Sequence, residues 1–196
     1  MMTKCLQLPI MMTYNLLRGE FMERIAFIGH RDVDIVKIKN RLKSIVEKEI
    51  QNNVCHFIMG THGNFDKLAL LVCRELKQKY NNIQIEVVLN SLHKITNKDY
   101  ECQICAYSDI ETILFDTDNV FYKRKIIADN MKMIEKSTKL ICYVDETNSN
   151  SNSKKIMNYA KKLNKIVINV FEKSDNIYYN LTKEEKKLYF EKYLKK

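Results

Sequence analysis

Short apolar runs alternate with longer segments of helical spacing along most of this chain. Residues 25–28 form a compact apolar run, which is typical of a buried strand. In residues 33–50, which follow, apolar side chains recur three or four positions apart, as on one face of a helix. The same pairing returns several times. It predicts strands at 25–28, 54–59, 83–89, 111–115, 140–144 and 166–170, and helices at 33–50, 65–80, 118–136 and 154–163.

Capping residues support several of these helices. Asp32 or Asp34 can cap the helix at 33–50, and Asp118 can cap the helix at 118–136, because a short acidic side chain accepts hydrogen bonds from the free N–H groups of a first turn. Thr182 and Glu185 have the spacing of a capping box. We therefore expect a further helix at the C-terminal end of the chain.

The order of these elements predicts the fold class. Alternating strands and helices with short connections favour an α/β protein, here a Rossmann-like three-layer α/β/α fold with a mostly parallel central sheet. Right-handed crossovers should place the first strand near the centre. In such sheets ligands bind outside the carboxyl ends of the strands, where the strand order reverses. The pattern of residues 90–109 favours no element.

Composition adds constraints on class and compartment. The 196 residues suit one domain of ordinary size, and a hydrophobic fraction of 45% excludes a disordered chain. No apolar run reaches the roughly 18 residues of a membrane span, and no secretory signal is recognisable. We therefore expect no membrane association, a cytoplasmic location and reduced thiols for the six cysteines.

The chain divides into three parts. Residues 1–21 contain the only proline, and codons for Arg-Gly-Glu at 18–20 would resemble a ribosome-binding sequence ahead of Met22. We expect 1–21 to be a non-native or disordered N-terminal extension. Residues 22–172 then form the Rossmann-type domain. Residues 173–196 form a Lys-rich helix that packs on the domain or on a partner subunit.

Positive charge gathers toward the C-terminus. The net charge is +9, and residues 154–196 hold 12 lysines against 5 acidic residues. Such a segment can contact a polyanion such as nucleic acid. A solvated, Lys-rich helix face explains the same composition, and we favour that interpretation. Nucleic acid is therefore a possible partner, but not the favoured one.

Glycines point to a candidate site. The chain has four, and three of them, Gly29, Gly60 and Gly63, follow the first two predicted strands directly. Turns between strand and helix need glycine for their own sake, but such turns also bind phosphate or carboxylate at the start of the helix. Two such turns would lie side by side at one edge of the sheet. With the polar residues beside them, they favour an anion or nucleotide site.

The polar residues of these turns differ in what they offer. Arg31 is always charged and is the best anion ligand, while His30 either donates to a phosphate or caps its turn. His62 and Thr61 lie in the second glycine turn. Asp66 falls in the first turn of a helix, where it stabilises the helix dipole, orients a neighbouring loop or binds a ribose.

The motifs at these turns are similar to those of a known family. Gly-His-Arg at 29–31 after the first strand, and Gly-x-x-Gly-x-x-Asp at 60–66 after the second, resemble the SLOG superfamily. Within it the likeness is to the small YpsA-type proteins, relatives of the DNA-processing protein DprA and of the LOG cytokinin-activating hydrolases. Further segments resemble the family at residues 129–137, 143–145, 159–162 and 165–170.

The resemblance implies a Rossmann-like, usually homo-oligomeric protein, here a dimer or tetramer, that binds nucleotides or nucleotide-derived ligands. By resemblance alone, Asn130 and the turn Ser151, Asn152 and Ser153 join the site, with Asn152 suited to the left-handed conformation of such a turn. The sequence departs from the family at Asp129, where the family has a phosphate-binding arginine, although Arg124 lies nearby.

Three functions follow as alternatives. We favour a binding module, a sensor or sequestering domain for a nucleotide-derived ligand. The second is a nucleotide N-glycosidic hydrolase of LOG type, with Asp66 or Asp129 near the sugar; the glycine-rich LOG motif is absent from the sequence. The third is single-stranded DNA binding through the Lys-rich tail and its aromatic residues. The ligand-binding candidates are Gly29, His30, Arg31, Gly60, Thr61, His62, Gly63, Asp66, Asn130, Ser151, Asn152 and Ser153.

No bound cofactor or metal is expected. Cys102 and Cys105 have the spacing of a metal-binding pair, but a second cysteine or histidine pair at matching spacing is missing. The sequence assigns no catalytic residue.

Overall fold

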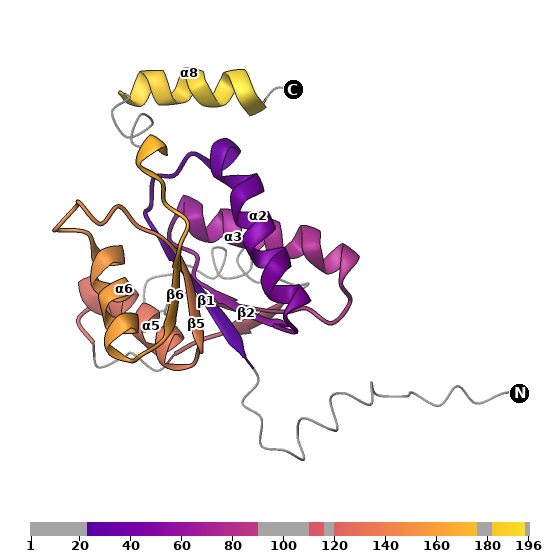
Figure 1. Ribbon diagram of the computed structural model, residues 1–196. Coiled ribbons are helices and arrows are strands. Elements are labelled where there is room, and N and C mark those ends of the chain that lie inside the picture. The colour runs from indigo at the N-terminus through magenta and orange to yellow at the C-terminus, as the bar shows by residue number, and fades with distance from the viewer. Residues whose placement is uncertain (1–22, 90–109, 116–119, 176–181, 195–196) are drawn as a thin grey trace, which may run out of the picture.

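Six parallel strands form the central sheet of the protein (Figure 1). The computed structural model describes residues 23–89, 110–115, 120–175 and 182–194. Across the sheet the strand order is β4-β3-β2-β1-β5-β6, and every neighbouring pair is parallel. The strands are β1 (Arg24–Gly29), β2 (His56–Met59), β3 (Gln84–Val88), β4 (Glu111–Ile113), β5 (Lys139–Tyr143) and β6 (Ile166–Asn169).

Helices cover both faces of this sheet, which confirms the three-layer α/β/α class. In the described part of the chain the covering helices are α2 (Ile35–Gln51), α3 (Asn64–Lys79), α5 (Tyr122–Glu135) and α6 (Asn152–Lys162). A short 3₁₀ turn, η2 (Lys173–Asp175), and the C-terminal helix α8 (Lys183–Leu194) come after β6. Figure 1 shows α2 and α3 on one side of the sheet and α5 and α6 on the other.

Alternate residues of each strand supply the two halves of the core. In β1, Ile25 and Phe27 pack in the cluster that includes α2 and α3, whereas Ala26 and Ile28 pack in the cluster that includes α5 and α6. Because both faces of the central strands β1, β2 and β5 are buried, their sequences are almost continuously apolar rather than alternating with polar residues. This explains why short apolar runs marked the strands so clearly.

The first strand lies between β2 and β5, as the crossover rule predicted. The chain moves outward from β1 through β2 and β3 to β4 and then returns to build β5 and β6 on the other side of β1. The strand order therefore reverses between β1 and β5.

The predicted capping residues have different outcomes. Asp34 caps α2 by accepting from the Lys37 N–H at 3.1 Å. The box at α8 is also formed, because Thr182 and Glu185 exchange hydrogen bonds between side chain and backbone. The prediction for α5 is wrong in its start, since the helix begins at Tyr122, and Asp118 lies outside the described residues.

Several predictions fall on parts of the chain that are not described. The N-terminal extension at 1–21 and the segment 90–109, with Cys102 and Cys105, lie outside the described residues. Cys55, Cys73 and Cys142 are free thiols. Among the described residues, no helix combines the length and the apolar character that crossing a membrane requires.

Candidate functional site

The turns after β1 and β2 touch each other at the carboxyl edge of the sheet. The Asn64 N–H donates to the Arg31 carbonyl at 2.9 Å, which joins the start of α3 to the first turn. Gly63 allows this approach, because a Cβ atom there would lie 3.2 Å from the Cα of Arg31. Gly29 allows Phe65 of α3 to pack against the end of β1, because a Cβ atom at Gly29 would lie 2.4 Å from the ring of Phe65. Two of the three glycines therefore hold the turns together.

A pocket of about 530 Å³ opens between these turns. Four of the predicted residues, Arg31, Thr61, His62 and Gly63, line it. Its lining also includes three residues that the sequence analysis did not predict as site residues: Asp32, Asn64 and Lys67. The pocket lies at the strand ends where the glycine pattern had placed it.

Two cations from different elements border this pocket. Arg31 follows β1, and its Nε donates to the His62 carbonyl at 3.4 Å; Lys67 belongs to the first turn of α3. Both residues are exposed. A lysine at the start of a helix faces the positive end of the helix dipole, a placement that costs helix stability. This unfavourable placement of a lysine in a predicted first turn is the sequence signal that could have indicated Lys67 as a binding residue.

The pocket also has one carboxylate in its lining, and this group has a partner. Asp32 forms an ion pair with Lys186 of α8, and the distance between Asp32 Oδ2 and Lys186 Nζ is 2.6 Å. The charge of Asp32 is therefore balanced within the protein, and Arg31 and Lys67 give the pocket lining a net positive charge.

Asp66 supports the second turn from beneath. Its Oδ2 accepts from the N–H groups of His62 and Gly63 at 2.9 and 3.2 Å. Together with the bond from Asn64 to Arg31, these contacts occupy backbone N–H groups that would otherwise serve an anion at the start of α3. The residue is partly exposed, but its carboxyl group is surrounded by protein, and burial raises the pKa of Asp66 to about 6. Asp66 orients the loop, as one of the interpretations of the sequence had it.

Gly60 and Asn130 lie beside Asp66. A Cβ atom at Gly60 would lie 3.3 Å from Oδ2 of Asp66 and 3.9 Å from Oδ1 of Asn130. None of the three belongs to the lining of the pocket. They form the support of the second turn rather than its exposed surface.

His30 connects the first turn to the loop after β5. Its Nε2 accepts from the Asp145 N–H at 2.8 Å, and its Nδ1 lies 3.4 Å from Oγ of Ser151. Because Nε2 is an acceptor, the neutral ring carries its proton on Nδ1 and donates toward Ser151. Burial lowers the pKa of His30, which favours this neutral form.

The predicted turn at 151–153 belongs to a helix instead. Ser151 is the N-cap of α6, accepting from the Lys154 N–H, while Asn152 and Ser153 are its first residues. The described non-glycine residues with positive φ are Asn53 and Asn164, so the left-handed conformation expected of Asn152 is not found. Ser153 donates to the Gly29 carbonyl at 2.7 Å.

These contacts span the crevice where the strand order reverses. His30, after β1, accepts from the Asp145 N–H after β5, and Ser153 of α6 donates to the Gly29 carbonyl at the end of β1, so hydrogen bonds cross the position at which ligands bind in many such sheets. The open pocket lies one strand away, between β1 and β2. The predicted set thus separates into pocket residues and residues that join the two loops.

Metal ligands do not gather in the described residues, where no group of three or more His, Cys, Asp and Glu side chains could hold an ion. Comparison with known proteins gives no family: no protein-family model matches the sequence, and no curated protein matches it as a relative.

Proposed function

We propose that this protein is a binding module for a nucleotide or a nucleotide-derived ligand whose phosphate occupies the pocket between the turns after β1 and β2. The observation that carries the proposal is the convergence of Arg31 and Lys67, from two elements, on one pocket at the carboxyl edge of a parallel sheet. Arginine binds phosphate through paired N–H donors, and lysine adds a point charge.

The dimensions and the electrostatics of the pocket agree with a small anionic ligand. A volume of about 530 Å³ lies within the range of small-molecule sites. A bound phosphate would offset the unfavourable position of Lys67 in the first turn of α3. Thr61, His62 and Asn64 supply further polar groups along the same wall.

The resemblance to the SLOG superfamily supports the same ligand class, and we propose that the chain is a SLOG-type protein of the YpsA kind and forms a homo-oligomer. Hydrolysis of the N-glycosidic bond receives less support. The carboxylates considered for it, Asp66 and Asp129, lie outside the pocket lining, and the carboxylate that does line it, Asp32, is ion-paired to Lys186. We therefore favour binding without catalysis.

Thermal shift with a panel of ligands tests the proposal. We expect AMP, ADP, cyclic nucleotides or ADP-ribose to raise the melting temperature, because a ligand at a hundred times its Kd stabilises the folded state by about 2.7 kcal/mol. Arg31→Ala should weaken binding by about tenfold or more, since it removes a charge-assisted phosphate contact.

Lys48→Ala is the matched control, because Lys48 is an exposed cation in the last turn of α2, far from the pocket. Equal affinity of the Arg31→Ala variant and the parent would show that the ligand binds elsewhere. Chromatography of AMP after incubation with the protein tests the alternative. Free adenine among the products would favour the hydrolase over the binding module.

A further inference from the structure

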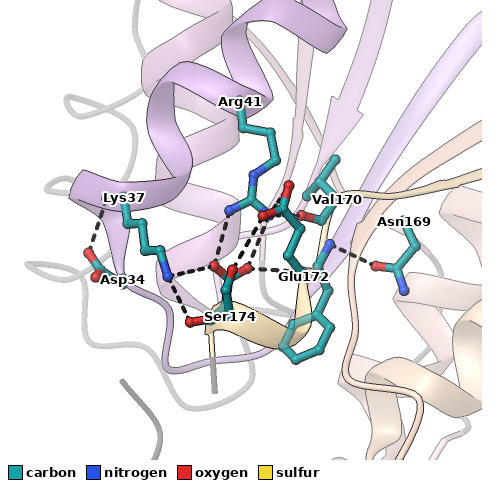
Figure 2. Close-up of polar contacts among 9 residues, drawn as sticks. Asp34, Lys37, Arg41, Asn169, Val170, Glu172 and Ser174 are labelled. Carbon is teal, nitrogen blue, oxygen red and sulfur yellow. Dashed lines mark hydrogen bonds and ion pairs between the residues drawn. The ribbon is translucent and has the colours of Figure 1, made fainter. Parts of the chain in front are cut away.

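The segment that leads to α8 is fixed to α2 beside the pocket. Arg41 of α2 donates to the Val170 carbonyl at 2.7 Å and pairs through both terminal nitrogens with the carboxylate of Asp175, each at 3.1 Å. The Asp175 side chain is only 1% exposed. Figure 2 shows this cluster, with Arg41 reaching down from α2 to the turn that follows β6.

A lysine from the first turn of α2 adds to the same anchor. Lys37 Nζ donates to the Ser174 carbonyl at 2.8 Å and lies 3.2 Å from Oδ1 of Asp175 (Figure 2). Asp34, which caps α2, follows the pocket residue Asp32 by two positions. The chain therefore leaves η2 at the end of α2 that borders the pocket.

Helix α8 directs one lysine toward that pocket. The capping box of Thr182 and Glu185 fixes the first turn, and Lys186 follows it directly. Lys186 pairs with Asp32 at 2.6 Å, and its side chain is only 19% exposed. The next residue, Lys187, is exposed. Of these two neighbouring cations, one lies against the pocket wall and the other faces solvent.

We propose that Lys186 is a third cationic ligand-binding residue of the pocket, supplied by α8, and that ligand binding and the seating of α8 on the pocket are coupled. The inference rests on the proposed function, and the ligand class is the same: a nucleotide-type molecule with one or more phosphate groups. The contact that carries it is the ion pair of Lys186 with a residue of the pocket lining.

Two physical arguments support this role. An ion pair with a half-exposed carboxylate such as Asp32 stabilises a structure only weakly, so it cannot by itself hold α8 firmly. An anion beside Arg31 would attract the same ammonium group and add a second contact. Because coupling is reciprocal, a helix that strengthens ligand binding is itself held more firmly when the ligand is bound.

Affinity measurements by calorimetry on the full chain test the inference, with ADP and ADP-ribose as probes. Lys186→Ala should weaken binding by about tenfold, within the usual range of coupling between two sites. Lys187→Ala is the matched control, on the same helix, and should bind as the parent does.

Asp32→Asn separates direct binding from charge neutralisation. If Lys186 contacts the ligand, Asp32→Asn should bind at least as tightly as the parent, and the double variant Asp32→Asn with Lys186→Ala should bind more weakly than Asp32→Asn alone. Equal affinities of the double variant and of Asp32→Asn would overturn the inference, because Lys186 would then act only by neutralising Asp32.

Limited proteolysis of α8 tests the coupling. Saturating ADP or ADP-ribose should slow cleavage within residues 183–194 in the parent and in Lys187→Ala, but not in Lys186→Ala. If Arg31→Ala abolishes binding while Lys186→Ala changes neither affinity nor cleavage, the inference falls and the proposed function stands. If the parent binds neither probe, both fall.

Discussion

The carboxyl group of Asp66 lies beneath the turn after β2 and accepts hydrogen bonds from two backbone N–H groups of that turn. These bonds favour the ionised form, yet burial outweighs them and raises the pKa of Asp66 from 3.8 to about 6. A carboxyl with a raised pKa binds more protons in the folded than in the unfolded state between these two values. The free energy of unfolding therefore decreases as the pH rises through this window.

Asp66→Asn should remove this dependence. The amide oxygen keeps an acceptor for the two N–H groups, while the buried charge is lost. We expect the variant to gain stability relative to the parent as the pH rises from 4 to 6.5, reaching roughly 1–3 kcal/mol above that, since one pKa unit corresponds to about 1.4 kcal/mol. Urea unfolding across this pH range measures the gain. A stability difference that is constant with pH would contradict the assignment.

His56 is the opposite kind of buried group. It is 4% exposed at the start of β2, and neither ring nitrogen has a hydrogen-bond partner among the described residues. Burial, with the nearby charge of Arg24, lowers the pKa of His56. The folded state therefore binds fewer protons than the unfolded state, and stability is lost as the pH falls below the ordinary value of 6.5.

Replacing His56 with leucine should stabilise the protein. An unsatisfied buried polar group costs about 1–3 kcal/mol, and an apolar side chain of similar size avoids that cost. We expect His56→Leu to raise the melting temperature at pH 8 and to raise it further at pH 5.5. At the lower pH the imidazole of the unfolded parent is protonated, and folding must also remove that proton. A lower melting temperature at both values would mean that the imidazole makes a contact that the described residues do not reveal.

At the scale of elements, the pattern of the sequence predicts the strands and helices, but it does not predict the side-chain contacts that join one element to another. The Arg41–Asp175 pair joins α2 to η2 across more than 130 positions of sequence, and no local pattern marks the two residues as partners. Burial alone would raise the pKa of Asp175, but hydrogen bonds that it accepts from Arg41, the Glu172 N–H and Lys37 hold this pKa below its ordinary value. This pair sets where the C-terminal segment leaves the domain.

Breaking the pair should loosen that segment. Arg41→Met leaves the buried carboxylate of Asp175 with Lys37 as its remaining cationic partner among the described residues, and we expect a loss of about 2–4 kcal/mol in unfolding free energy. The double variant Arg41→Met with Asp175→Asn should recover most of this loss, because the charge that needs a partner is gone. Urea denaturation of the two variants gives both values. A double variant as unstable as Arg41→Met would show that packing of the arginine stem, rather than the ion pair, is what matters.

At the scale of the whole molecule, the position of the pocket departs from the general rule for parallel sheets. The strand order reverses between β1 and β5, but His30 and Ser153 bridge that crevice. The open site lies between β1 and β2, where two glycine turns meet. Sequence reasoning found the turns, and with them Arg31 and His62, because glycine after an apolar run is a local signal.

The C-terminal helix completes this arrangement. Among the described residues, the ion pair of Lys186 with Asp32 joins α8 to the turn after β1. The aromatic side chains at 189, 190 and 193, which were considered for DNA binding, lie outside the described side chains. Electrostatics at the pocket are thus the product of three segments that are far apart in the chain.

The sequence was enough to predict the α/β class, the order of strands and helices, a cap of α2 at Asp32 or Asp34, the box at Thr182 and Glu185, and the two glycine turns. All of these depend on residues within a few positions of each other, so spacing is enough to detect them. Only the folded structure shows that Ser153 donates to the Gly29 carbonyl, that His30 accepts from the Asp145 N–H, and that Lys186 lies at the pocket. Those roles depend on which elements become neighbours, and a contact between residues distant in sequence leaves no periodic trace in the chain.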